Sequence, residues 1–389
     1  MYIVNYECLS SAGLGVEKFM QGLQNGEDHS VPLTETTFSH PVWPTGRACF
    51  IPDQDLKNRQ YSETFKKHFS LVWEKLAEKF EVDLDLKGSL FILASTKGLL
   101  EEYIWQGSSQ ATGQDPFSLA AQEIRESLAN DQIEILTVSN ACSSSHVAFE
   151  LADKILKTKR YKNIFVVAFD YVGPFVVRGF QSLKVFAKEK NRPFSAIRDG
   201  LQLGEAVAIF HLSADADSNS RAKLVGAAST LQTQSVTRPS MDGSTLMQVL
   251  ESLLSENPSE DQHSFLKPDF FIAHGTGTTF NDLSEDRALA EFQKNRNFSA
   301  PVTSTKWSIG HCLGASGAMD IIAACELLNG AHFFSIANTE QIDSQLQNHY
   351  IFAKSKMNEV IFDQKSPRAI VTSLGFGGVH AAVHLKAGL

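Results

Sequence analysis

The sequence predicts an α/β fold made of two similar halves, on three observations. Short apolar runs alternate with segments of helical periodicity, small or polar residues follow several of these runs, and the same order returns after residue 215. This alternation is typical of buried sheets covered by helices. We therefore expect an N-terminal half at 1–215 and a C-terminal half at 216–389. No repeat is visible in the sequence itself, so the duplication rests on the order of the elements.

The N-terminal half alternates buried strands with helices. Strands are expected at 89–96, 133–138, 163–170 and 206–213, and helices at 118–129 and 145–158. An insertion at 35–85 interrupts this order, beginning with a loop that contains Pro and Trp. Its second part, "YSETFKKHFSLVWEKLAEKF", places apolar residues at helical spacing, which predicts an amphipathic helix over 61–80.

The polar stretch "ADADSNSRAK" at 214–223 contains the boundary, and the C-terminal half repeats the pattern after it. Its apolar segments are expected at 222–229, 268–275, 300–306 and 368–385. Across the two halves, four turns beside strands carry residues that could take part in chemistry.

The composition fits a globular protein and excludes several classes. Apolar residues make up 43% and charged residues 20%, which allows a large core. The net charge of −9, without a basic stripe, argues against nucleic-acid binding. The five cysteines lack CxxC spacing, which excludes a disulfide scaffold or zinc ribbon and suits a reducing compartment. We see no signal peptide and no apolar stretch of membrane-spanning length, so a cytoplasmic protein is expected.

The first motif is "SNACSSSHVAFE", which places Cys142 between a predicted strand and a predicted helix. A thiol at a helix N-terminus has its thiolate stabilised by the helix dipole and by free backbone N–H groups, which lowers its pKa. Such a cysteine is a candidate nucleophile. A buried cysteine that only packs fits the same stretch, and this motif alone does not decide between the two.

Two further motifs bring histidines and a lysine to the ends of strands. "FFIAHGTGTT" places His274 before Thr276 and Thr278, and "TSTKWSIGHCLGASGAMD" contains Lys306 and His311. Threonines between glycines form a polar turn that can hydrogen-bond an extended amide ligand. Taken alone, a core histidine and a surface lysine are the more ordinary explanations.

The fourth motif is "SLGFGGVHAAVHL". Glycines flank Phe376 and allow unusual backbone dihedral angles. The turn can then present its N–H groups to a ligand, which is the geometry that an oxyanion hole requires.

In this order the four motifs resemble those of the elongating β-ketoacyl-acyl-carrier-protein synthases. That family has a cysteine in an ACSS or ACAS turn, then HGTxT with two acids, then K…GH…GASG, and a terminal GFGG. Asp282 and Glu285 match the two acids, and "FSAIRDGLQLGEA" also resembles a family segment. The resemblance covers nearly the whole chain. It implies a thiolase-like fold, with duplicated α/β halves in α-β-α-β-α layers.

The resemblance implies an acyltransferase, a 3-oxoacyl-acyl-carrier-protein synthase that condenses an acyl chain with malonyl-carrier protein and releases carbon dioxide. Neither a metal nor a diffusible cofactor is expected, because phosphopantetheine of the carrier holds the substrates. The implied roles are Cys142 as nucleophile, His274 and His311 as oxyanion donors, Lys306 as their support paired with Glu285, Asp282 as a supporting acid, Thr276 and Thr278 as pantetheine ligands, and the N–H groups of Cys142 and Phe376 as a second oxyanion hole.

The implied partners are an acyl carrier protein and a second subunit, either another copy of the chain or a chain-length-factor-like paralogue. Carrier proteins of this kind are acidic, so docking requires local basic residues. Lys184 matches the position of a carrier-contacting base in the family, and Lys66 and Lys67 are further candidates. Ordinary solvated charges explain each of these lysines equally well.

The sequence departs from the family at His380, where asparagine is usual, and at Ser145, where glycine is usual. These departures suggest a divergent branch that makes polyketides or aryl polyenes rather than housekeeping fatty acids. Two other functions stay open: a catalytically silent chain-length-factor-like or carrier-binding subunit, and a hydrolase that uses the same cysteine. The intact cysteine, histidines and lysine argue against the silent subunit.

Overall fold

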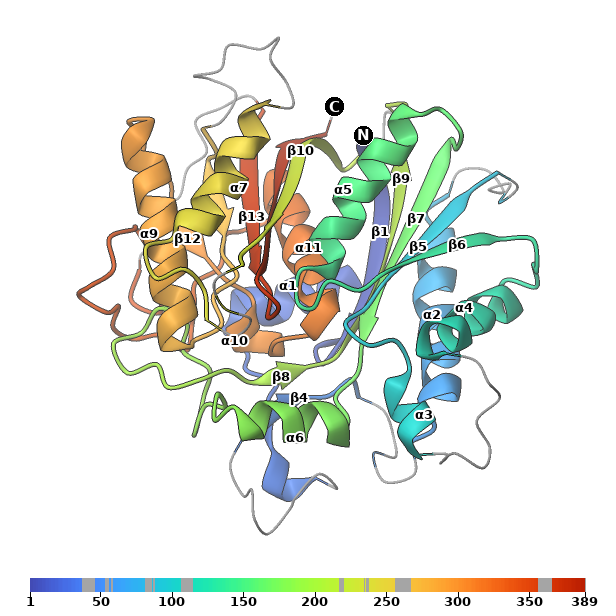
Figure 1. Cartoon of the computed structure of the whole chain (residues 1–389), viewed down its shortest axis with the longest axis horizontal. Coiled ribbons are helices and arrows are strands. Elements are labelled where there is room, and N and C mark those ends of the chain that lie inside the picture. Colours follow the sequence, from blue (N-terminus) through green and yellow to red (C-terminus); the bar gives the residue numbers. More distant parts are fainter. Residues whose placement is uncertain are drawn as a thin grey trace.

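The central feature of the molecule is an 11-stranded mixed sheet (Figure 1). Its strand order is β12-β11-β13-β14-β10-β1-β9-β7-β5-β6, with β2 paired to β1. The computed structural model describes residues 1–36, 46–52, 56, 59–80, 86, 88–105, 115–216, 220–233, 235, 238–255, 267–355 and 366–388.

The sheet consists of two halves that share one strand pattern. The first half runs β1 (Tyr2–Ser10), β9 (Ala206–Ser213), β7 (Asn163–Asp170), β5 (Leu90–Ala94) and β6 (Glu134–Val138). The second half runs β10 (Ala222–Leu231), β14 (Val379–Ala387), β13 (Arg368–Leu374), β11 (Phe270–Ile272) and β12 (Val302–Thr303). In each half the first two pairings are antiparallel and the last two are parallel. The predicted duplication of the α/β fold is therefore confirmed.

Helices form three layers that enclose the two halves of the sheet. The middle layer holds α5 (Ser144–Lys157) and α11 (Ser316–Leu328). These two helices contact each other, and α5 contacts β5 and β7 of the first half as well as β10 and β14 of the second. Within α11 every residue except Glu326 is buried, as expected for a helix that is apolar on all sides.

The outer layers cover the remaining faces. On the first half, α2 (Tyr61–Ala77) contacts β1 and β9 and carries α4 (Pro116–Ser127). On the second half, α7 (Ser244–Ser255) contacts β10 and β14 and lies against α9 (Thr279–Asn295). The predicted thiolase-like order of layers is thus the observed one (Figure 1).

The smaller elements connect the main ones. A three-stranded sheet has the order β3-β4-β8. The smaller elements are β2 (Gly13–Leu14), α1 (Val16–Asn25), β3 (Val31–Pro32), η1 (Leu33–Glu35), β4 (Arg47–Cys49), α3 (Leu100–Trp105), α6 (Pro174–Ser182), β8 (Leu203–Gly204), α10 (Lys306–Ile309) and η2 (Leu313–Ala315).

The sequence predicted these strands and helices closely, but one prediction about burial is wrong. The run at 133–138 was expected to be a buried strand, yet β6 is the last strand of the sheet and Leu136 is 43% exposed. An apolar run does not reveal whether a strand lies at an edge. The predicted boundary near residue 215 lies between β9 and β10, partly outside the described residues, and stays a prediction. So does the loop expected at the start of the 35–85 insertion, where 37–45 are not described.

None of the helices in the described ranges is long and apolar enough to cross a membrane. The cytoplasmic location stays a prediction.

Candidate active site

The candidate site residues follow parallel strands in both halves of the sheet. Cys142 follows β6, His274 follows β11, and Lys306 and His311 follow β12. In the repeated pattern β6 and β12 occupy equivalent positions, and α5 and α11 come next in each half. The two turns meet where α5 and α11 pack against each other: the Ser145 hydroxyl donates to the Gly314 carbonyl, and Lys306 is close enough for its charge to act on the Cys142 thiol.

Cys142 lies in a tight turn just before α5. Ala141 has a φ of 49°, in the left-handed region that few residues other than glycine adopt. The Ser144 hydroxyl donates to the Ala141 carbonyl and accepts the Asn140 N–H at 2.9 Å, which fixes the turn. The backbone strain is thus supported by a side chain of the same turn, and Cys142 is held at the helix start.

The Cys142 thiol is buried, and burial raises its pKa to about 11. The Phe376 backbone N–H hydrogen-bonds the sulfur and opposes this rise, as does the Lys306 cation. The prediction that the helix N-terminus gives Cys142 a low pKa is therefore wrong for the free protein. The Phe376 N–H thus lies beside Cys142, and the oxyanion hole predicted from the Cys142 and Phe376 N–H groups stays a prediction.

His311 is held as a neutral imidazole with one defined tautomer. Its Nδ1 accepts the Leu313 N–H at 2.9 Å and lies 3.2 Å from the Ser316 hydroxyl. Because Nδ1 accepts a backbone hydrogen bond, the ring proton is on Nε2. Burial and the Lys306 cation lower the pKa of His311 to about 3. The ring is therefore an uncharged N–H donor at neutral pH.

His274 faces His311 edge to face, with the ring centroids 5.3 Å apart. Neither ring nitrogen of His274 has a hydrogen-bond partner among the described residues, although the ring is buried. Burial, then Lys306 and His311, lower the pKa of His274 well below its usual range. Two buried polar atoms without partners are costly, which suggests that a ligand supplies the missing hydrogen bonds.

Lys306 is buried and pairs with Asp320, not with the predicted Glu285. Its ammonium lies 2.6 Å from the Asp320 carboxylate, and both side chains are 1% exposed. Glu285 instead accepts the backbone N–H groups of His274 and Gly275 at 2.7 and 2.9 Å and so fixes the turn that carries His274. The prediction of a Lys306–Glu285 pair is wrong. The sequence analysis gave no role to Asp320, the acid on α11 that Lys306 contacts.

Asp282, in the first turn of α9, supports the same loop between β11 and α9 that Glu285 fixes. It accepts the Gly277 N–H at 3.1 Å and the Phe194 N–H at 2.7 Å, and Arg198 lies 3.7 Å away. Burial raises the pKa of Asp282 to about 7, while the Phe194 N–H and Arg198 oppose the rise. Arg198 belongs to the "FSAIRDG" segment but was not named as a site residue.

The two threonines lie in the turn between His274 and α9. Thr276 is buried, Thr278 is partly buried, and their hydroxyl oxygens are 2.9 Å apart. The hydroxyls pair with each other in this structure, and pantetheine binding by them stays a prediction.

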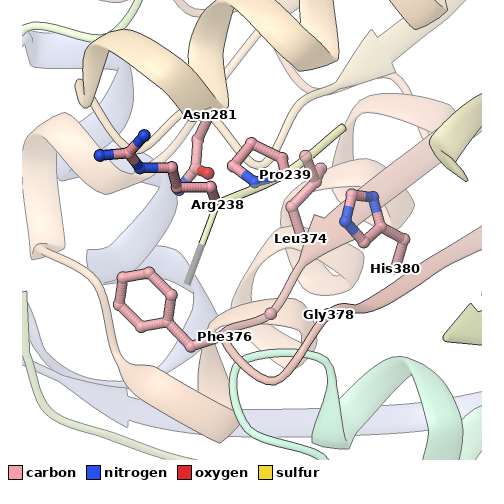
Figure 2. Close-up of a pocket in the computed structure, with 8 residues that line it drawn as sticks. Arg238, Pro239, Asn281, Leu374, Phe376, Gly378 and His380 are labelled. Atoms are coloured by element: carbon pink, nitrogen blue, oxygen red, sulfur yellow. The ribbon is translucent and has the colours of Figure 1, made fainter. Parts of the chain in front are cut away.

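The turn after β13 carries Phe376 and a small pocket (Figure 2). Gly377 and Gly378 have φ values of 90° and 83°, which favour glycine and turn the backbone sharply. Figure 2 shows Phe376 and His380 on either side of Leu374. Burial lowers the pKa of His380 to about 4, and its Nδ1 has no partner among the described residues. The other departure from the family pattern is Ser145 on α5. Its hydroxyl donates to the Gly314 carbonyl at 2.5 Å and so connects α5 to the segment before α11.

Asp170 is a further residue that the sequence analysis missed. At the end of β7, it accepts the Thr96 and Gly314 N–H groups, both at 2.8 Å, and links the two halves next to the site. Asp320 ends the motif "TSTKWSIGHCLGASGAMD" but was given no role there, and Asp170 ends the strand expected at 163–170. A signal was present, since each is an acid within an apolar run.

The predicted docking lysines differ in their surroundings. Lys184 is exposed just after α6 and makes no ion pair within the described part of the chain. Lys66 pairs with Glu123 and Glu126 between α2 and α4, so its charge is already balanced. Lys67 is exposed on α2. A carrier-docking role for the three lysines stays a prediction.

No cluster of histidine, cysteine or acidic side chains suited to a metal ion occurs in the described ranges.

Two family models match the chain in succession. The Beta-ketoacyl synthase N-terminal domain matches residues 134–218, and the C-terminal domain matches 221–340. Together these matches span just over half of the chain and include Cys142, His274, Lys306 and His311. Phe376 lies beyond them.

Relatives and solved structures agree with the family models. The tetracenomycin polyketide synthase ketoacyl synthase alpha subunit of Streptomyces glaucescens is 26% identical over 64% of this chain and 59% of its own length. The 3-oxoacyl-[acyl-carrier-protein] synthase 2 of Synechocystis is 28% identical over 55% and 52%. The chain thus spans little more than half the length of these curated relatives.

The similarity of fold extends over the whole chain. A ketosynthase solved in complex with its chain length factor, from Xenorhabdus doucetiae, superposes with a TM-score of 0.78 at 18% identity, covering 100% of this chain and 98% of that one. With both family models matched in order and the site residues inside them, this chain belongs to the β-ketoacyl synthase family.

Proposed function

We propose that the protein is a β-ketoacyl-acyl-carrier-protein synthase that works by decarboxylative Claisen condensation. The observation that carries the proposal is the pair of uncharged imidazoles, His274 and His311, set edge to face next to a buried lysine whose field also acts on the Cys142 thiol. Thioester condensation needs a nucleophile together with N–H donors for developing oxyanions.

In the first half-reaction the Cys142 sulfur attacks the thioester carbon of an acyl chain carried on phosphopantetheine. The bond from that carbon to the pantetheine sulfur breaks, and the pantetheine thiol leaves with the proton that Cys142 loses. The backbone N–H groups of Cys142 and Phe376 stabilise the oxyanion of the tetrahedral intermediate. The Phe376 N–H is already at the sulfur in the free protein.

In the second half-reaction a malonyl thioester loses carbon dioxide, and the electron pair stays on the α-carbon as an enolate. The His311 Nε2–H, fixed by the hydrogen bond at Nδ1, donates to the enolate oxygen together with His274. The α-carbon then attacks the acyl carbon on Cys142. The bond to sulfur breaks, and the Cys142 thiolate takes up a proton from water, because its original proton left with the pantetheine thiol. In this scheme burial, together with the Lys306 cation, keeps both imidazoles uncharged. The scheme uses no metal or diffusible cofactor.

The partners follow from the same proposal. Acyl carrier protein delivers both substrates, in line with the names of relatives such as the 3-oxoacyl-[acyl-carrier-protein] synthase 2 of Synechocystis. A second subunit covers the edge strand β6, where Leu136 is 43% exposed and backbone groups are open for pairing. That subunit is a second copy of this chain or a chain-length-factor-like paralogue. A polyketide or aryl polyene pathway agrees with the tetracenomycin relative and with the departures at Ser145 and His380.

Reconstitution with acyl-carrier and malonyl-carrier substrates tests the proposal. Mass spectrometry should detect a 3-oxoacyl chain on the carrier and one mole of carbon dioxide per condensation. The Cys142→Ala variant should form no product. Free acid in place of the 3-oxoacyl product would favour a hydrolase. Labelling of Cys142 by cerulenin without any turnover would favour the silent carrier-binding subunit.

A further inference from the structure

An apolar groove runs from the surface toward the candidate site between α6 and the start of α3. It has a volume of about 550 Å³, which is enough for a chain of ten or so heavy atoms. Its walls are mainly apolar and include Leu100, Phe175, Val176, Phe180 and Leu313. Figure 1 shows α3 and α6 near each other at one end of the molecule.

Three lining residues connect the groove to the site. The Thr96 hydroxyl lies 3.4 Å from the carbonyl of Ala141, next to Cys142. The Leu313 N–H binds His311 Nδ1 at 2.9 Å. The Phe180 ring packs on the Phe376 ring with centroids 5.6 Å apart. The groove therefore adjoins residues that contact the Cys142 turn, His311 and Phe376, and we take it as the space for a chain attached to Cys142.

One lining side chain does not fit an apolar groove. Lys97 lines the groove and is only 8% exposed. No carboxylate oxygen of the described residues lies within 4.0 Å of its ammonium. The Lys97 charge acts on the Asp170 carboxylate at longer range, but the Asp170 oxygens already accept hydrogen bonds from Ser95, Thr96 and Gly314.

The Lys97 ammonium has no ion-pair partner among the described residues and lines the groove, so a ligand in the groove can supply acceptor oxygens to it. Glu101, also near the groove, faces the backbone N–H groups of Phe175 and Val176 at 3.3 and 3.4 Å and is engaged there. Neither Asp170 nor Glu101 therefore forms an ion pair with Lys97. The groove combines mainly apolar walls with the cation of Lys97.

We propose that Lys97 is a specificity-determining residue and that the groove holds an acyl chain bearing an acceptor oxygen, a keto carbonyl or a carboxylate, rather than a plain alkyl chain. This inference rests on the proposed function, since it takes Cys142 as the point of attachment. Lys97 does not touch the reacting atoms. It selects the chain by donating hydrogen bonds to it inside the groove, where a charged donor is stronger than in water.

Binding of unreactive substrate analogues tests the inference separately from turnover. Three acyl-pantetheine amides of equal chain length are titrated calorimetrically: saturated, with keto groups, and with a terminal carboxylate. An amide cannot acylate Cys142, so affinity is read even if condensation fails. The wild-type protein should bind at least one oxygenated amide about tenfold more tightly than the saturated one. Equal affinities, or no binding of any amide, would overturn the inference.

The variants separate selection from structural support. Lys97→Met should lose the preference for oxygenated chains and bind the saturated amide at least as well, and Lys97→Arg should keep the preference. Lys162→Met, an exposed lysine before β7 at the end opposite Asp170, is the matched control and should bind like wild type. If Lys97 only supports Asp170, Lys97→Met and the milder Lys97→Gln will lower the melting temperature without changing the order of the three affinities, and the inference fails.

Discussion

The Lys306 ammonium lies 2.6 Å from the Asp320 carboxylate in a fully buried ion pair at the centre of the site. Removing one partner leaves an uncompensated buried charge, which costs about 3–5 kcal/mol. Asp320→Asn should therefore lower the free energy of unfolding by this order, measured by urea denaturation. Asp269→Asn, at a partly buried acid just before β11, should cost much less. A near-neutral Asp320→Asn would show that Lys306 has another partner.

Replacing Cys142 separates the two half-reactions. Cys142→Ala should abolish acyl transfer and condensation while the fold stays intact, because the side chain is small and lies in a turn fixed by Ser144. Cys142→Gln should still decarboxylate malonyl-carrier protein, since an amide can mimic the acylated thioester. Radiolabelled carbon dioxide release measures this. Unchanged condensation by Cys142→Ala would end the proposed mechanism.

Removal of either imidazole should affect the second half-reaction selectively. His274→Ala and His311→Ala should each slow decarboxylation by two to three orders of magnitude, since one lost oxyanion donor costs about 3 kcal/mol. Acylation of Cys142, followed by mass spectrometry of the intact protein, should persist in both. If acylation vanishes as completely as decarboxylation, the division of labour between the histidines and the Phe376 N–H is wrong.

Much of the site could be predicted because each motif is local. A strand followed by small residues and a helix is visible in the sequence at Cys142, and the glycines at 377 and 378 indicate the turn with positive φ that the structure contains. The order of strands and helices likewise predicted the duplicated fold, since hydrophobic periodicity is itself a local property.

What the sequence did not reveal depends on contacts between distant segments. Asp320 stands within "GAMDIIAACELL", where an acid among apolar residues gives no indication of its partner. The pKa of Cys142 depends on which of two opposing effects is larger, stabilisation of the thiolate by the helix terminus or its destabilisation by burial. A helix terminus contributes about 0.3–1 kcal/mol, less than one pKa unit, whereas full burial can shift a pKa by several units. Burial therefore dominates, and only the fold shows how deep the thiol lies.

The raised pKa of Cys142 predicts a specific pH dependence of thiol alkylation. With a folded-state pKa of about 11, the thiolate fraction at neutral pH is small and rises about tenfold per pH unit. The rate of Cys142 alkylation by iodoacetamide should keep rising up to about pH 10, whereas an ordinary exposed thiol levels off above about pH 8.5. Peptide mapping assigns the label, and circular dichroism checks the fold at each pH. A plateau near pH 7 would show that the site favours the thiolate even without substrate.

The last prediction concerns carrier docking at Lys184, the exposed lysine that follows α6. Two net-negative partners repel at long range, but salt screens this repulsion beyond about 8–10 Å, so one nearby cation can dominate the encounter. Lys184 has a φ of 55°, and its N–H caps the helix by donating to the Gln181 carbonyl at 3.0 Å, so its backbone position is fixed. Lys184→Glu should raise the KM for the acyl-carrier substrate several-fold and flatten its salt dependence, while turnover of a small pantetheine thioester stays nearly unchanged. Lys184→Gln removes the charge and keeps a side chain of similar length, so its KM for the acyl-carrier substrate should lie between those of wild type and Lys184→Glu. Lys162→Glu, at another exposed lysine, is the control. Equal loss with the carrier and the small thioester would mean that Lys184 supports the pocket and that the carrier docks elsewhere.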